Sequence, residues 1–176
     1  MIGLLVASNK DFLIVGNMNA MCYSNIYTLF IKNKIWYGAS IHGGDRKFYV
    51  PDDYPLNASE CGFDDEGKRY VKVKGVRWFT NIQHSFINPQ LVTDAKYDPA
   101  KYAKYDNYDA INIDKVKNIP LDYSGEMGVP ISFLDKFNPD QFEITGFRKG
   151  TDGRDLSING KCPYFRVLIK VRKKVQ

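Results

Sequence analysis

Two acidic side chains and a lysine have the loose spacing of a metal-dependent nuclease site. Asp52 follows a proline, and Glu66 and Lys68 come further along, on either side of Gly67. In such nucleases, two carboxylates hold the cation and a lysine steadies the attacking water. Glu66 and Lys68 flank a glycine typical of a tight turn, whereas that site requires a rigid strand. The turn therefore argues against a nuclease, although the spacing keeps it as an alternative.

Two Asn-Pro dipeptides each match half of the Asn-Pro-Pro-aromatic motif of amino-group methyltransferases. They are Asn88-Pro89 and Asn138-Pro139, the second followed by Asp140. In the complete motif, an amide and a backbone carbonyl accept hydrogen bonds from the target amine, and the ring stacks on the extruded base. Neither dipeptide is followed by a second proline and an aromatic residue, and Asn-Pro commonly starts a turn. Neither dipeptide therefore supplies a catalytic residue.

Histidine and cysteine, which carry much catalytic and metal chemistry, are few in this chain. His42 opens a glycine loop that ends at Asp45, the nearest approach to a catalytic loop, although a histidine in such a loop is more often structural. The only other histidine is His84, and the three cysteines lie far apart, at Cys22, Cys61 and Cys162. This spacing gives neither a disulfide framework nor a zinc-ligand set. No phosphate-binding glycine loop or nucleophile elbow is present, so we predict no catalytic residue, no cofactor-binding residue and no metal site.

The stretch at residues 70–81, YVKVKGVRWFTN, combines cations with aromatic rings. Tyr70, Lys72 and Lys74 alternate with valines, which predicts a half-buried strand with a cationic outer face. Gly75 interrupts this alternation before a second β-prone run, so we expect a bulge or a sharp bend there.

This stretch suits nucleic acid, because lysine and arginine neutralise phosphates while an aromatic ring stacks on a base. The pattern alone favours an ordinary strand with solvated lysines and a tryptophan in the core. The candidate DNA contacts are Lys72, Lys74 and Arg77, with Trp78 and Phe79 expected to form the core that holds them.

A second cluster of tyrosines and polar residues spans residues 97–108. Its rings and amides could contact base edges or the sugar-phosphate backbone. A tyrosine-rich loop packed on a sheet explains the cluster equally well. From this cluster we take Asn107 and Tyr108 as further candidate DNA contacts.

Composition sets broad limits on the kind of protein. The 176 residues, of which 44% are hydrophobic, predict one compact domain, or a domain with a small appendage, with a substantial core. A net charge of +5 permits a polyanionic partner, and the part after Gly146 is distinctly basic. Residues 1–8 are apolar but too short to span a bilayer and lack a basic lead. We therefore expect a cytoplasmic protein with no membrane partner.

The elements that must position these candidates begin as an α/β layer. Residues 1–8 suit the last turns of a helix, and residues 12–15 are predicted as a central strand of a parallel sheet. Helical spacing over residues 19–33 and a strand at residues 35–37 complete a βαβ unit. Ligands bind beyond the carboxyl ends of such strands, which places Asn17, Met18 and Asn19 at the edge of any cleft.

From Gly38 onward the pattern is β-like and rich in turns. A helical turn is predicted at residues 98–104 and a short helix at residues 130–137. The final strand is expected to pair in a hairpin across Asn159-Gly160. The predicted strands cover residues 47–50, 110–113, 141–147 and 164–171.

Ordered segments along the whole chain resemble the EcoRI-type adenine-specific DNA methyltransferase family. The resemblance covers essentially all 176 residues and corresponds to the carboxyl-terminal part of the family. The matching segments are 12–20 (FLIVGNMNA), 34–38 (KIWYG), 50–55 (VPDDYP), 74–81 (KGVRWFTN), 104–112 (KYDNYDAIN), 127–136 (MGVPISFLDK), 138–144 (NPDQFEI) and 158–170.

This resemblance implies an α/β fold class. The C-terminal remnant of a Rossmann-like methyltransferase sheet would occupy residues 1–40. A β-rich region, the expected DNA target-recognition region, would follow at residues 41–176, either separately or within one compact unit. The activity implied is methyl transfer from S-adenosylmethionine to the N6 of an adenine flipped out of duplex DNA. The family's cofactor loop and Asn-Pro-Pro-Phe motif would lie upstream of Met1, so we expect this chain alone to bind no S-adenosylmethionine and to be inactive.

Three functions stay open. The chain is the carboxyl-terminal portion of an adenine-N6 DNA methyltransferase, a noncatalytic DNA-binding or interaction module derived from that family, or a metal-dependent nuclease. The expected partners are duplex DNA and either an N-terminal methyltransferase half or a second copy, joined through exposed strand edges. A natural truncation, a subunit of a split enzyme and an engineered fragment are all compatible with the sequence.

Overall fold

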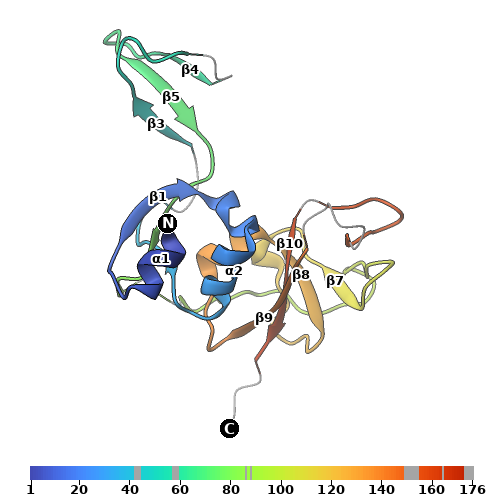
Figure 1. Ribbon diagram of the computed structural model, residues 1–176. Helices are drawn as coiled ribbons and strands as arrows, with labels where there is room; N and C mark the ends of the chain where they lie inside the picture. The colour runs from blue at the N-terminus through green and yellow to red at the C-terminus, as the bar shows by residue number, and fades with distance from the viewer. Residues whose placement is uncertain are drawn as a thin grey trace. The chain divides into compact units, whose positions relative to one another are not determined.

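The computed structural model describes residues 1–41, 45–56, 60–85, 87, 89–148, 155–163 and 165–172. The chain is of the α/β class, with mixed sheets and few helices (Figure 1). It divides into two compact units, Met1–Ser85 and Phe86–Gln176. The boundary predicted at residue 40 is a functional one, between a catalytic layer and a recognition region. That functional division stays a prediction. Within the described ranges, no helix is both long and apolar enough to cross a membrane.

The first unit starts with the predicted helix and βαβ connection. Its elements are α1 (Ile2–Ala7), β1 (Leu13–Asn17), the 3₁₀ helix η1 (Met18–Cys22), α2 (Ser24–Ile31), β2 (Trp36–Tyr37) and, much later, β6 (Val76–Thr80). The sheet order is β1-β6-β2, with β6 antiparallel to both neighbours. β1 and β2 therefore run parallel to each other, but β6 lies between them.

The prediction that residues 12–15 form a central strand of a parallel sheet is wrong. In the described chain, β1 is an edge strand whose neighbour is antiparallel. Its side chains alternate in exposure, with Leu13 56% and Val15 42% exposed. The apolar run predicts a strand correctly, but it cannot reveal that a strand from residues 76–80 will pair with it.

One face of this sheet forms the core of the first unit with α2. The Phe30 ring of α2 lies 5.2 Å from the Tyr37 ring, measured between centroids, and Tyr37 lies 5.3 Å from Phe79 in an edge-to-face arrangement. Phe79 is fully buried, which confirms it as a core residue. Aromatic rings in this geometry attract one another beyond the area they bury, so this cluster fixes β6 in the sheet.

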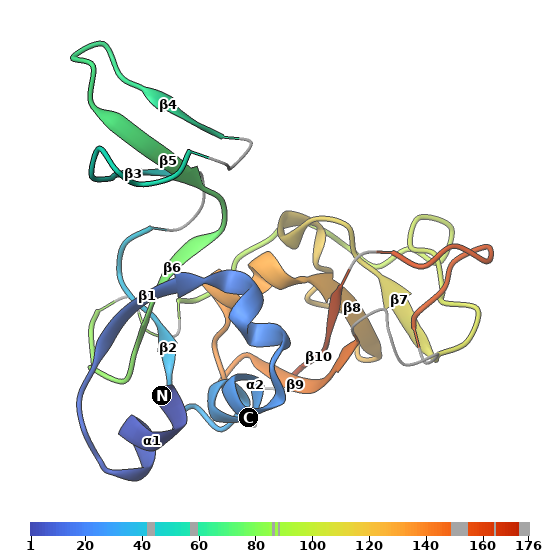
Figure 2. The same ribbon diagram turned by 45° about the horizontal axis from the view of Figure 1, so that its top comes forward.

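A second sheet in the first unit contains β3 (Arg46–Tyr49), β4 (Cys61–Phe63) and β5 (Arg69–Val73), in the antiparallel order β3-β5-β4. We call residues 45–74, as far as they are described, the arm. The strands of the arm lie clear of α1 and α2 (Figures 1 and 2). The tight turn predicted before β5 is present, with Gly67 N donating to Asp64 O at 2.9 Å.

The bend predicted at Gly75 is confirmed. Gly75 has φ +66°, a conformation that costs other residues about 1–2 kcal/mol. It separates β5 in the arm from β6 in the other sheet, so the chain changes sheets at this residue.

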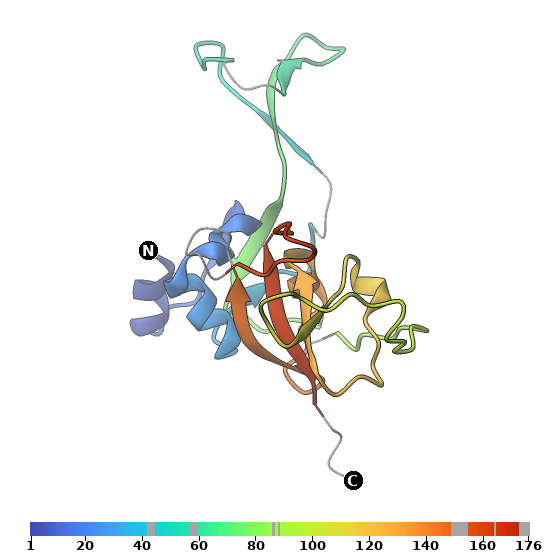
Figure 3. The same ribbon diagram turned by 90° about the vertical axis from the view of Figure 1, so that its right-hand side faces the viewer.

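The second unit is a four-stranded sheet with short 3₁₀ helices. Its elements are β7 (Ala110–Asn112), η2 (Val116–Asn118), β8 (Glu126–Pro130), η3 (Ile131–Lys136), β9 (Phe142–Arg148) and β10 (Arg166–Val171). The order is β7-β8-β10-β9, with only β7 and β8 parallel. Figure 3 shows the red β10 between the orange β8 and β9.

Most elements predicted for this unit are confirmed, with three corrections. The helix at residues 130–137 is a 3₁₀ helix, and β8 was not predicted because Gly128 and Pro130 suggest a turn. The turn at Asn159-Gly160 exists, closed by a bridge between Ile158 and Lys161. β10, however, pairs with β9 and β8 rather than across that turn.

The core of the second unit lies between this sheet and η3. Phe133 of η3 contacts Phe142 of β9 edge to face, at a centroid distance of 5.1 Å. β8 passes through the centre, and a side chain at Gly128 would place a Cβ 2.2 Å from the Tyr105 hydroxyl. The fully buried side chains include Ile111, Met127, Val129, Phe133, Phe142 and Ile169.

Candidate nucleic-acid interface

The arm has two chemically different faces. Residues directly opposite each other on antiparallel strands share a face, and β3 and β5 pair Lys47 with Lys72 and Tyr49 with Tyr70. We call this side the lysine face; it comprises Asp45, Lys47, Tyr49, Glu60, Tyr70, Lys72 and Lys74. The opposite face carries Arg46, Phe48, Phe63, Arg69 and Val71.

The candidate contacts Lys72 and Lys74 lie at the surface but already contact carboxylates. Lys72 Nζ lies 3.2 Å from Asp45 Oδ2 and 3.6 Å from Glu60 Oε2. Lys74 Nζ pairs with the other oxygen of Glu60. The hydrogen bond that Lys72 donates to Asp45 raises the pKa of Lys72, and the one that Lys74 donates to Glu60 raises the pKa of Lys74. The lysine side chains are 40% and 69% exposed, so a polyanion could reach both in competition with these carboxylates.

Aromatic rings accompany the lysines on the same face. Lys47 Nζ lies 4.3 Å from the centroid of the Tyr70 ring, within the range of a cation–π interaction. Tyr49, opposite Tyr70, is 61% exposed. The lysine face therefore combines ammonium groups with accessible rings, as expected from the alternation in sequence.

The opposite face of the arm is partly covered by the chain itself. Arg69 Nη2 donates to Tyr54 O at 2.7 Å, and its guanidinium carbon lies 5.6 Å from the centroid of Phe63. Because this guanidinium is half-buried and held by the loop after β3, the lysine face is the more open cationic surface of the arm.

Arg77, the third candidate DNA contact from residues 70–81, points into the first unit. It is 3% exposed, and its Nη1 donates to Val76 O at 2.8 Å. Its guanidinium carbon lies 5.8 Å from the centroid of Tyr37. After the bend at Gly75 the chain enters a different sheet, in which Arg77 lies on the same buried face of β6 as Phe79. In this conformation Arg77 is inaccessible to a phosphate, and its role in DNA binding stays a prediction.

Trp78 lies on the opposite face of β6, beside a pocket of about 420 Å³. His84 also lines this pocket, and its Nε2 lies 3.0 Å from Tyr37 O. The remaining lining residues are Leu13, Gly38, Ala39, Ser40, Thr80 and Ile82. Trp78 is half-buried, so it borders solvent as well as the sheet, and the pocket is walled mainly by apolar groups.

The cleft-edge candidates lie where β1 meets the base of the arm. Asn17 Nδ2 donates to Lys74 O at 2.8 Å, and Asn17 Oδ1 accepts from Asn19 N at 2.9 Å. Met18 N donates to Gly75 O at 2.7 Å. Through these hydrogen bonds Asn17 and Met18 hold the base of the arm. Their place beside a ligand cleft stays a prediction.

In the second unit, Asn107 and its neighbour hold a distant segment. Asn107 Nδ2 donates to Asp155 O, and its Oδ1 accepts from Ser157 N at 3.0 Å. Asp106 accepts from Gly160 N at 2.9 Å, and this bond, with others from Asn159 and Ser157, lowers the pKa of Asp106. Both ends of the Asn107 amide are thus engaged within the fold.

Tyr108 is half-buried and packs against a small core cluster. The guanidinium carbon of Arg148 lies 5.3 Å from the centroid of the Tyr108 ring. A side-chain hydrogen bond with Glu126 raises the pKa of Tyr108. The DNA-contact roles of Asn107 and Tyr108 stay predictions.

The basic carboxyl-terminal part is only partly available to a polyanion. Arg166 is buried and pairs with Asp114 at 3.3 Å, and Lys170 Nζ lies 3.5 Å from Glu126. Arg172 Nε donates to Pro139 O at 2.8 Å. Four cations of this part, Lys149, Arg154, Lys173 and Lys174, lie outside the described residues.

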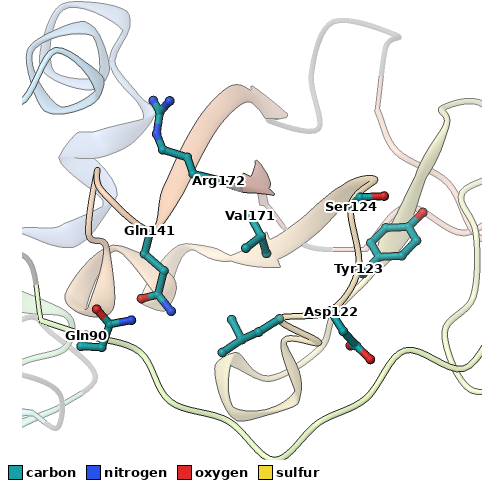
Figure 4. A pocket seen from close by; sticks show the side chains of 8 residues that line it. Gln90, Asp122, Tyr123, Ser124, Gln141, Val171 and Arg172 are labelled. Atoms are coloured by element: carbon teal, nitrogen blue, oxygen red, sulfur yellow. The ribbon is translucent and has the colours of Figure 1, made fainter. Parts of the chain in front are cut away.

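Arg172 borders a pocket of about 430 Å³, which the sequence did not predict. Figure 4 shows Arg172 pointing away from Asp122 and Tyr123. The amide of Gln141 is held by the backbone of Leu91, since it accepts from Leu91 N at 2.9 Å and donates to Leu91 O at 2.7 Å. The other lining residues are Gln90, Leu121, Ser124 and Val171.

The other catalytic candidates gain no support from the geometry. Glu66 and Lys68 pair with each other at 2.7 Å in the exposed turn, and the described residues contain no group of three potential metal ligands. Asn138 Oδ1 accepts from Asp140 N at 2.9 Å, as expected of a turn. His42 and Asn88 lie outside the described residues.

Comparison with known proteins identifies the family. The model described as "Adenine-specific methyltransferase EcoRI" matches residues 1–173. The chain is 48% identical over 171 residues to the Type II methyltransferase M.EcoRI of Escherichia coli, covering 96% of this chain and 52% of that protein. It is 38% identical over 189 residues to the Type II methyltransferase M.MgeORF184P of Mycoplasma genitalium, covering 96% of this chain and 59% of that protein.

A third relative, the Type II methyltransferase M.MpnI of Mycoplasma pneumoniae, is 35% identical over 192 residues, covering 98% of this chain and 60% of that protein. The chain therefore spans only about half to three-fifths of the length of these relatives. No solved structure matches it significantly. The match over residues 1–173 confirms the family expected from the sequence: the chain belongs to the EcoRI-type adenine-specific methyltransferase family.

Proposed function

We propose that this chain is the DNA-facing carboxyl-terminal portion of an S-adenosylmethionine-dependent adenine-N6 DNA methyltransferase. The observation that carries this proposal is the family match over residues 1–173, within relatives about twice as long. The complete protein would transfer a methyl group from the cofactor to an adenine flipped out of duplex DNA. The chain alone is inactive in this proposal, because its sequence contains no Asn-Pro-Pro-Phe motif.

The first unit supports a place at the border of a larger sheet. β1 is an edge strand, and Leu13 and Val15 on it are 56% and 42% exposed. Nearby in sequence, the apolar helix α1 has no buried residue, and its Leu4 is 73% exposed. An open edge with exposed apolar side chains favours association with another chain segment. We propose that an N-terminal methyltransferase half completes a Rossmann-like sheet here, and that without it the chain self-associates.

The two pockets described above give no positive support for a site for S-adenosylmethionine. Its ribose hydroxyls call for acceptors such as a carboxylate, and no acidic residue lines the pocket beside Trp78. The pocket beside Arg172 contains Asp122, but Oδ1 of this carboxylate already accepts a hydrogen bond from Tyr97 N at 3.0 Å. We therefore derive no cofactor step from these residues and keep the prediction that the chain alone does not bind the cofactor.

Duplex DNA is the proposed partner, and the lysine face of the arm supports it. Lys72 and Lys74 are proposed to contact phosphates, since both are exposed cations on a β-ribbon beside accessible tyrosines. We propose that the engaged side chains of Arg77, Asn107 and Tyr108 contribute by holding DNA-facing segments in place.

A chimera tests the catalytic proposal. The chain is joined to the amino-terminal part of M.EcoRI that it does not match, and transfer of tritiated methyl groups to duplex DNA is measured. We expect the chimera to methylate adenine at N6 and the chain alone to be inactive. A folded but inert chimera would favour the second candidate, a noncatalytic DNA-binding module, which the missing catalytic motif in these 176 residues supports.

A further inference from the structure

Glu60 holds a fixed position on the lysine face of the arm. Its carbonyl oxygen accepts a hydrogen bond from Lys72 N at 2.7 Å, which extends the pairing of β4 with β5. Its carboxylate lies 3.6 Å from Lys72 Nζ through one oxygen and pairs with Lys74 through the other. One carboxylate thus bridges both lysines proposed to contact DNA.

The charges on this face nearly cancel. Lys47, Lys72 and Lys74 contribute three positive charges, and Asp45 and Glu60 contribute two negative charges, which leaves one positive charge. Asp45 lies 3.2 Å from Lys72, so both carboxylates contact the lysines directly. The hydrogen bond that Glu60 accepts from Lys74 lowers the pKa of Glu60, so the ion pair favours the charged carboxylate.

A carboxylate and a phosphate offer an ammonium group the same kind of anionic oxygen acceptor. A phosphate that binds Lys72 or Lys74 must therefore displace Glu60 or share the ammonium with it. The exchange of one anion for another releases less free energy than the binding of a phosphate to a lysine that has no carboxylate partner. Since nonspecific DNA binding is essentially electrostatic, this exchange weakens nonspecific binding.

We propose that Glu60 is an internal competitor for the lysines of the arm and limits how tightly the lysine face holds the backbone of DNA of any sequence. This proposal rests on the proposed DNA partner. Glu60 thereby sets the sequence-independent, electrostatic part of the affinity for DNA.

The test compares Glu60→Gln with Asp52→Asn by fluorescence anisotropy on a random-sequence duplex between about 50 and 200 mM salt. Asp52 is an exposed residue of the arm outside the lysine face, so both variants change the net charge equally. We expect Glu60→Gln to bind about 3- to 10-fold more tightly at low salt, with a salt slope steeper by about 1. Asp52→Asn should differ little from wild type. Thermal melting verifies that each variant is folded.

A double-mutant cycle locates the effect. In a background with Lys72→Ala and Lys74→Ala, the gain from Glu60→Gln should disappear. A gain that persists there, or an equal gain in Asp52→Asn, would overturn the proposal in favour of a general charge effect. DNA binding by the wild type with no gain in folded Glu60→Gln would also overturn it, while leaving the DNA partner intact. Absence of binding in every variant at low salt would contradict the DNA partner itself.

Discussion

The side-chain amide of Asn17 donates to the carbonyl oxygen of Lys74 at 2.8 Å. Next to this bond, Met18 N donates to Gly75 O at 2.7 Å. The last residue of β1 and the first residue of η1 are therefore bonded to the two residues at which the chain leaves the arm. The arm is thus fastened to the sheet of the first unit at its base.

Loss of the Asn17 amide should loosen this base. Asn17→Ala removes two hydrogen bonds, the one donated to Lys74 O and the one accepted from Asn19 N. We therefore expect it to lower the free energy of unfolding by about 2 kcal/mol, at a usual net value of about 1 kcal/mol for each bond. Amide hydrogen exchange in β5 should become faster. Asn19→Ala is the matched control, because only the backbone N–H of Asn19 bonds to Asn17. Equal exchange rates in the two variants would show that the Asn17 bond does not hold the arm.

The bend at Gly75 should tolerate a side chain poorly. Its φ is +66°, and an added Cβ would lie 3.1 Å from Met18 Cγ. Gly67→Ala is the control, since Gly67 has φ +75° but no atom within 4 Å of the added Cβ. Each variant should lose about 1 kcal/mol through backbone strain, and Gly75→Ala should lose more because Met18 must move. Urea unfolding measures both losses, and equal losses would contradict the close packing at Gly75.

Two neighbouring aromatic residues of β6 should respond differently to truncation. Phe79 is fully buried, so Phe79→Ala should cost about 3–5 kcal/mol of unfolding free energy. Trp78 is half-buried beside a pocket, so Trp78→Ala should cost less. Calorimetric melting compares the two variants. If Trp78→Ala melts like the wild type but loses DNA affinity, Trp78 is a stacking residue and its assignment to the core is wrong.

Acid should weaken the hydrogen bonds that Asp106 accepts from residues 157–160. Hydrogen bonds from Gly160 N, Asn159 N and Ser157 lower the pKa of Asp106 in the folded state. A carboxylate whose pKa is lowered by folding stabilises the folded state at pH values above its unfolded pKa of about 4. This stabilisation is lost as the pH falls through the pKa of the folded state. Asp106→Asn should therefore be less stable than wild type at neutral pH, and the difference should shrink below about pH 4.

The control for Asp106→Asn is Asp109→Asn, because the Asp109 side chain is 97% exposed. Melting temperatures between about pH 6 and 2.5 cover the range in which an aspartate titrates. A stability difference between Asp106→Asn and wild type that is independent of pH would contradict a role for the ionised carboxylate.

Local patterns in the sequence revealed much of the fold. The alternation at residues 70–74, the glycine at position 75 and the turn before β5 all depend on neighbouring residues, and all three are present. The insertion of β6 between β1 and β2 depends on pairing between strands that are far apart in sequence. No local pattern encodes such a pairing, so the predicted position of β1 in the sheet was wrong.

The candidate site shows the same limit. The lysines of the arm were found from their period, but their carboxylate partners Asp45 and Glu60 lie on other parts of the arm, brought close only by the order β3-β5-β4. The amide of Asn107 is bonded to residues 48 and 50 positions away. The availability of a polar side chain thus depends on tertiary contacts that its own neighbourhood in sequence does not show.

The most direct test is isothermal titration calorimetry of the chain with S-adenosylmethionine and, separately, with duplex DNA. We predict no measurable heat from the cofactor, together with DNA binding that weakens steeply as salt rises. Micromolar binding of S-adenosylmethionine, or no binding of DNA at low salt, would contradict the proposal that this chain is the DNA-facing portion of the enzyme.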